Sequence, residues 1–125
     1  MALGELIYTA LTTDAGVSAL VGSRVYPLYL PQDPTLPAVT YQQISRVRRS
    51  ERSTVSRVRV QFDCWAQTYR EARQLADTLR PALDGYHAQG APNIVEADLA
   101  NEVDTFAPDV EGNRIIVDFF LTITE

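Results

Sequence analysis

The chain has 125 residues, of which 46% are hydrophobic and 22% charged, and its formal net charge is −5. This length predicts a single domain over residues 1–125 with one buried core, and no apolar run reaches the ~18 residues of a membrane-spanning helix. Cys64 is the single cysteine and no Lys or Arg precedes Arg24, so we expect no internal disulfide, no signal peptide and synthesis in a reducing cytoplasm.

Two helices and a loop are predicted in the first third of the chain. Apolar residues that recur at helical spacing indicate the first helix: Leu3, Leu6, Ile7, Ala10 and Leu11. Asp14 can cap a second, short helix, and Gly22 can follow its end. A short extended piece over residues 24–26 comes next. Four prolines then predict a surface loop over residues 27–37, because proline ends helices and disfavours central strands.

The remaining elements are a hairpin, a helix and two strands. Alternating apolar and polar residues predict a long antiparallel hairpin over 38–48 and 55–66, with its tip at 49–53. A capping-box pattern at Thr68 and Glu71 starts a helix; Pro81 weakens its last turn and Gly85 ends it. Strands follow over 94–106 and 115–124. Strands and helices do not alternate regularly, so we expect an α+β fold: a largely antiparallel or mixed β-sheet with helices packed on one face.

No group of residues in the sequence indicates a catalytic, cofactor or metal site. His87 is the single histidine, which excludes two-histidine zinc motifs. Cys64 falls on the apolar side of its strand, where a thiol behaves as a small hydrophobe. Paired acids have the period-two spacing of a solvated strand face, and the isolated glycines form no phosphate-binding loop. We therefore expect no enzyme activity, no cofactor and no metal.

Charge is distributed unevenly along the chain. Six of the eleven basic residues lie in residues 46–59, whereas residues 84–125 carry nine acids against Arg114. Such polarity favours head-to-tail assembly with other copies and electrostatic capture of a partner. Close pairing of the two hairpin strands would bring arginines of opposite strands together, and each such contact costs about 0.2–1 kcal/mol.

The arginine hairpin has two readings. In one it is a solvated hairpin whose charge prevents edge-to-edge aggregation. In the other it contacts an acidic surface of another subunit or partner, or a phosphate backbone. Protein is favoured over DNA, because the chain is acidic and the arm lacks aromatic residues that stack on bases. The predicted interface comprises six arginines and four acids: Arg46, Arg48, Arg49, Arg52, Arg57, Arg59, Glu96, Asp98, Glu102 and Asp104.

Three segments carry a resemblance to a known family. They are Leu-Val-Gly-Ser-Arg-Val-Tyr-Pro over 20–27, Leu-Pro-Ala-Val-Thr-Tyr over 36–41 and Val-Gln-Phe-Asp-Cys-Trp-Ala over 60–66, the last running into a helix near Leu79. In order, spacing and chain length they resemble the tail completion family of long-tailed bacteriophages and prophages, the tail-to-head joining or tail terminator proteins. The resemblance extends from the first helix to the strand at Asp118.

The resemblance implies a ring-forming α+β subunit, expected to be a hexamer, at the head-proximal end of the tail tube. Such a ring would stop tube polymerisation and offer a surface to the head connector. The expected partners are other copies of the chain, the major tail tube protein and the head–tail connector protein, with no membrane. The expected location is the virion tail, after assembly in the bacterial host cytoplasm. The alternative is a connector module that contacts nucleic acid through its arginine hairpin.

Overall fold

The fold is a five-stranded sheet covered by helices on one face. The computed structural model describes residues 3–50, 54–84, 86, 93–107 and 112–124. In chain order the elements are α1 (Leu3–Thr13), α2 (Ala15–Val21), β1 (Val25–Pro27), β2 (Ala38–Arg48), β3 (Val55–Ala66), α3 (Tyr69–Leu83), β4 (Asn93–Ala107) and β5 (Gly112–Thr124).

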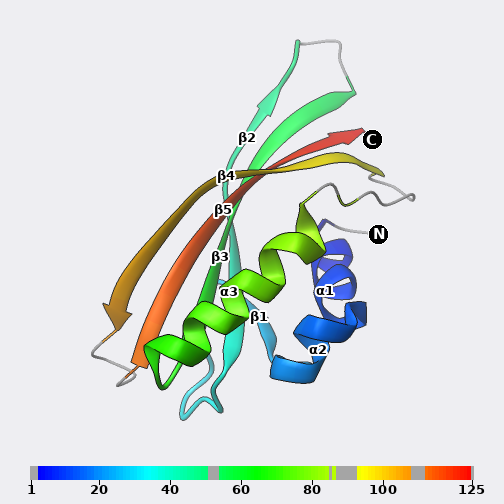
Figure 1. The fold of residues 1–125 in the computed structure, drawn as a ribbon. Coiled ribbons are helices and arrows are strands. Elements are labelled where there is room, and N and C mark those ends of the chain that lie inside the picture. Colours follow the sequence, from blue (N-terminus) through cyan, green and yellow to red (C-terminus); the bar gives the residue numbers. More distant parts are fainter. Residues whose placement is uncertain (1–2, 51–53, 85, 87–92, 108–111, 125) are drawn as a thin grey trace.

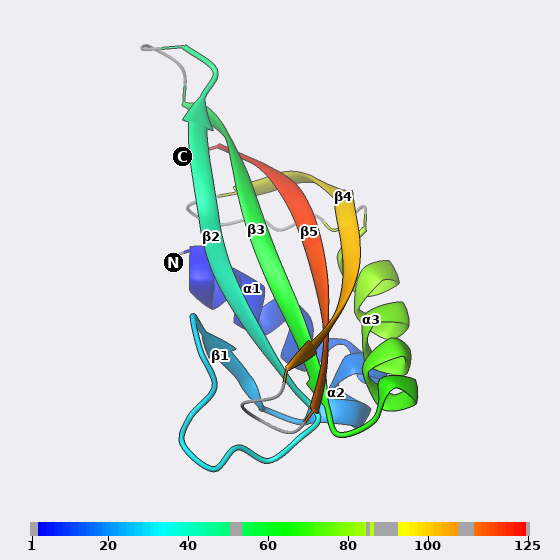
Figure 2. The ribbon, with the colours of Figure 1, turned by 90° about the vertical axis from the view of Figure 1, so that its left-hand side faces the viewer.

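The sheet is mixed, with the strand order β1-β2-β3-β5-β4. β1 runs parallel to β2, and every other neighbouring pair is antiparallel. The helices lie on one side of the long curved strands (Figure 1), and Figure 2 looks onto the other face, with the helices behind it. These observations confirm the predicted α+β fold with a long hairpin and helices on one face.

Strict alternation in β3 and β5 builds the core. Because successive strand residues point to opposite faces, one face of each strand is buried against the helices. At the centre the rings of Phe62 and Phe119 meet edge to face, with centroids 5.9 Å apart. The buried residues of these two strands are Val58, Val60, Phe62, Cys64, Ala66, Ile115, Val117, Phe119, Leu121 and Ile123.

The helices start and bury their faces as their sequences predict. The Asp14 carboxylate accepts from the Val17 amide at 3.0 Å and caps α2, and the Thr68 hydroxyl accepts from the Glu71 amide at 3.2 Å and caps α3. The predicted stripe of α1 is buried except at Leu3, which is half-buried and packs against the core. The predicted helix end at Gly85 lies outside the described residues. Within the described part of the chain, no helix is long and apolar enough to cross a membrane.

One edge of the sheet is β4, and the other is shared by the short strand β1 and the part of β2 that extends beyond it. β1 pairs with Val39–Tyr41 of β2 and stops there, because Pro27 has no amide to donate and the chain turns at Leu28, whose φ is 68°. From Gln42 onward, the outer side of β2 has no other described strand beside it. β4 forms the opposite edge over its whole length.

Candidate interaction surface

The β2–β3 hairpin separates its arginines between the two faces of the sheet. Arg46 lies opposite Val58 and Arg48 lies opposite Ser56, both of which are buried on the helix side. Opposed residues in an antiparallel pair share a face, so these two arginines project on the helix side.

The β3 arginines lie on the helix-free face instead. Arg57 is opposite Val47, and Arg59 is opposite Ser45. A register shift between Gln43 and Ser45 moves the arginines of β2 to the face opposite those of β3, since one extra residue reverses the side-chain alternation. The expected cross-strand contacts are therefore absent between the β2 arginines, Arg46 and Arg48, and those of β3. Arg49, just beyond the end of β2, does line the same surface depression as Arg57. Arg52 lies outside the described residues.

The two β3 arginines differ in their partners. The Arg59 guanidinium Nη2 lies 2.7 Å from Asp118 Oδ2, and the Asp118 side chain is only 5% exposed although no helix covers this face. The Arg57 guanidinium instead lies 4.0 Å from the centroid of the Phe120 ring, a cation–π contact. Among the described residues, no carboxylate pairs with Arg57.

A second polar cluster lies further along the same face. Arg114 Nη1 is 3.6 Å from Asp63 Oδ2, and its guanidinium stands 5.2 Å from the centroid of the Trp65 ring. The Gln61 amide donates to Asp63 Oδ1 at 2.9 Å. Burial raises the pKa of Asp63 above its ordinary value, an effect that the Gln61 hydrogen bond and the Arg114 charge only partly oppose. The two charges of this cluster, Arg114 and Asp63, compensate each other, although Arg114 Nε is buried without a hydrogen-bond partner among the described residues.

Two of the four predicted interface acids are bound by α3. Arg73 contacts Glu102 and lies 3.2 Å from Asp104, and Arg80 lies 3.3 Å from Glu102. The Tyr69 hydroxyl also donates to Asp104 at 2.8 Å. These ion pairs and the Tyr69 hydrogen bond hold β4 against α3.

The other two acids, Glu96 and Asp98, lie on the helix-free face. Asp98 is opposite Phe120, the residue whose ring Arg57 contacts. A register shift between Leu99 and Asn101 sends the acids before it and those after it to opposite faces. The four acids therefore do not form one acidic surface within a subunit, and only Glu96 and Asp98 share a face with the β3 arginines.

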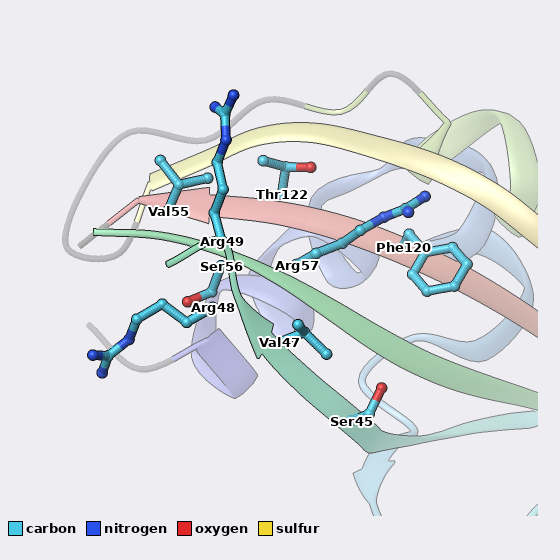
Figure 3. A pocket seen from close by; sticks show the side chains of 9 residues that line it. All are labelled: Ser45, Val47, Arg48, Arg49, Val55, Ser56, Arg57, Phe120 and Thr122. Carbon is cyan, nitrogen blue, oxygen red and sulfur yellow. The ribbon is translucent and has the colours of Figure 1, made fainter. Parts of the chain in front are cut away.

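A depression lies beside the tip of the β2–β3 hairpin, where Arg57, Phe120 and Thr122 line it from the helix-free face (Figure 3). Its volume is about 520 Å³, and Arg57 extends along it towards the Phe120 ring. Val47, which is 65% exposed, contributes apolar surface. The residues that line it are Ser45, Val47, Arg48, Arg49, Val55, Ser56, Arg57, Phe120 and Thr122.

The sequence prediction missed the apolar part of this depression. Val47 and Phe120 were assigned to alternating strands without a role on the outer face. The available signal was in β5, where Ile116 and Phe120 are apolar at positions that face away from the helices. Apolar residues on both faces of a strand indicate that the second face is also covered or binds something.

The described residues include no group of three or more metal-ligating side chains. Cys64 is fully buried, and burial raises the pKa of its thiol far above the ordinary value, which keeps it protonated and unreactive. His87 lies outside the described residues. Within the part of the chain that the structure describes, the candidate interaction surface is thus the depression with its flanking charges.

The fold and this surface define an α+β protein whose open sheet face combines apolar area with unneutralised charge, features that suit contact with other proteins. The family model described as Tail completion protein gp17 matches residues 5–124. The chain belongs to this family and is a structural tail protein of the phage type, which confirms the resemblance predicted from the sequence.

A solved structure has the same fold. A chain of the structure titled "Virion of native gene transfer agent (GTA) particle" matches 99% of this chain and 96% of its own length, with a TM-score of 0.77 and 18% identity. At this identity the likeness establishes the shared fold. A search of curated proteins gives no match to the sequence.

Proposed function

We propose that the protein forms a ring, most simply a hexamer, that caps the head-proximal end of the tail tube. The ring ends tube polymerisation and presents its other face to the head connector, so that its partners are copies of itself, the tail tube protein and the connector protein. The observation that carries this proposal is the family match over residues 5–124. It is supported by the edge strand β4 and by the part of β2 beyond β1, because such strand edges can pair with a neighbour.

The proposal assigns no catalytic step to the protein. Its work is to bind, and surfaces of complementary shape and charge decide what binds where. Assembly in the host cytoplasm followed by incorporation into the virion tail is consistent with this role.

Reconstitution with the tail tube protein tests the proposal. Native mass spectrometry and negative-stain electron microscopy of the purified chain are expected to show closed rings. Addition of the chain to polymerising tube protein is expected to give tubes that stop growing and carry one ring at one end. A chain that stays monomeric even with tube protein present, or tubes that elongate past the bound ring, would contradict the function.

A further inference from the structure

Pairing of the charged residues leaves two uncompensated groups on the helix-free face. Asp118 is neutralised by Arg59, and the acids after the second β4 register shift are bound by α3. Among the described residues, no group of opposite charge forms an ion pair with Arg49 or Arg57 at the β2–β3 hairpin, or with Glu96 or Asp98 on β4. One group is basic and lies at the β2–β3 hairpin, and the other is acidic and lies on the edge strand β4.

Arg57 and Glu96 lie on one row of the sheet. Val47 is opposite Arg57, Arg57 is opposite Thr122, and Thr122 is opposite Glu96. The row therefore crosses the helix-free face from the β2 edge to the β4 edge. Asp98 ends the next row, which begins at the other edge of the sheet.

Strand directions allow one sheet to continue into the next. β2 is antiparallel to β3, β3 to β5 and β5 to β4, so β4 runs antiparallel to β2. Rotation about an axis along the strands preserves these directions. In a ring, β4 of one copy therefore meets β2 of the next copy as an antiparallel pair, with the helices of both copies on the same side.

Charge and apolar area select this pairing over the symmetric alternatives. A two-fold contact of β4 with β4 would oppose acid to acid, and one of β2 with β2 would oppose basic hairpins, both unfavourable. The head-to-tail contact instead places Glu96 beside Val47 of the next copy, with Arg57 one strand further in. Two strand spacings amount to roughly 10 Å, which the two long side chains can bridge. Each edge also carries exposed apolar residues: Ile44 and Val47 on β2, and Leu99 and Val103 on β4.

We propose that neighbouring copies associate by pairing the β4 edge of one copy with the Gln42–Arg48 edge of β2 in the next, with Glu96 and Asp98 seated beside the Arg49–Arg57 depression. This proposal rests on the ring proposed above and specifies its subunit contact. The partner that the depression binds is then a second copy of the chain.

Charge reversal on each side of the contact tests the proposal. The variants R49E/R57E and E96R/D98R are each expected to remain monomeric at concentrations at which the unchanged chain forms rings, with association at least tenfold weaker. An equimolar mixture is expected to form rings in which the two variants alternate, because every contact in such a ring again joins opposite charges. Native mass spectrometry reads out this alternation directly. R70E is the control, since it reverses an exposed arginine on α3, in the helix layer and not on the helix-free face, and is expected to assemble normally.

The outcomes separate this contact from the function. If the unchanged chain forms rings and both variants do so equally well, or if the mixture of folded variants stays monomeric, the proposed contact is wrong while the tail-capping ring stands. If the unchanged chain forms no ring with or without tube protein, the proposed function fails first. Circular dichroism of each variant confirms that a loss of assembly is not a loss of folding.

Discussion

At the scale of single residues, charge on the helix-free face is either buried and paired or exposed and unpaired. Asp118 belongs to the first group. Although no helix covers its face of the sheet, the Asp118 side chain is almost fully shielded from water and forms an ion pair with Arg59. A carboxylate in this position depends on its partner, because burying an uncompensated charge is costly.

Replacement of Asp118 by asparagine tests that dependence. D118N is expected to lower the free energy of unfolding by about 1–3 kcal/mol, since a charge-assisted hydrogen bond becomes a neutral one. The loss is limited because the Arg59 side chain is 40% exposed and water can solvate it. D98N removes the same charge from an exposed position and is expected to change stability by less than about 0.5 kcal/mol. Urea denaturation of both variants measures the difference; equal values would show that the pair does not contribute.

Asp63 predicts a specific pH dependence. Burial raises its pKa above the ordinary value of 3.8, so the folded state binds its proton more tightly than the unfolded state. This contribution to stability is fully present below the unfolded pKa and is lost as the pH rises through the folded pKa. D63N retains an acceptor for the Gln61 amide and does not titrate. The stability of the unchanged chain relative to D63N is therefore expected to fall as the pH rises above the ordinary pKa of 3.8. Urea denaturation on both sides of this pKa measures the difference, and a rise with pH would contradict the raised pKa.

At the scale of elements, sequence patterns predicted the helices and strands better than they predicted which face of the sheet each charged side chain lies on. Strict alternation in β5 and helical spacing in α3 identified the core, because both periods persist without interruption. β1 is too short to show a period, so its parallel pairing with β2 was missed. The register shifts in β2 and β4 were also missed, although they decide that Arg46 and Arg57, or Glu96 and Glu102, lie on opposite faces.

Contact between α2 and α3 at Gly16 gives a prediction about helix packing. A Cβ at this position would lie 2.9 Å from Thr78 Cγ2, which is too close. In an open helix, alanine in place of glycine stabilises by up to about 1 kcal/mol, but here G16A is expected to cost about 1 kcal/mol because the helices must shift. T78S removes the Cγ2 methyl and keeps the hydroxyl that donates to Gln74 O at 2.8 Å. In a T78S background, G16A is expected to become neutral or stabilising. A double-mutant cycle by urea denaturation measures this coupling, and additive effects would exclude the contact.

At the scale of the whole molecule, the fold follows from its sequence and the partner surface follows only from the structure. Uneven charge along the chain predicted that assembly uses charge, and it named Arg57 and Glu96 among the candidates. It could not separate them from Glu102 and Asp104, because those acids find partners on α3, a helix distant in sequence. Long-range ion pairs of this kind depend on the folded arrangement, which a linear charge pattern does not contain.

Salt dependence distinguishes charge-directed assembly from purely apolar association. Each chain carries a net charge of −5, so copies repel one another at long range, and screening by salt would strengthen any association driven by apolar area alone. A contact between the basic depression and the acidic β4 edge has the opposite dependence, because salt screens the local attraction. Between about 50 and 500 mM NaCl we expect ring assembly to weaken roughly tenfold, equivalent to about 1.4 kcal/mol. Sedimentation velocity at each salt concentration measures the association constant.

The alternating ring of R49E/R57E and E96R/D98R should respond in the same direction, since its contacts also join opposite charges. Assembly that strengthens with salt would show that apolar area, rather than charge, holds the subunits together.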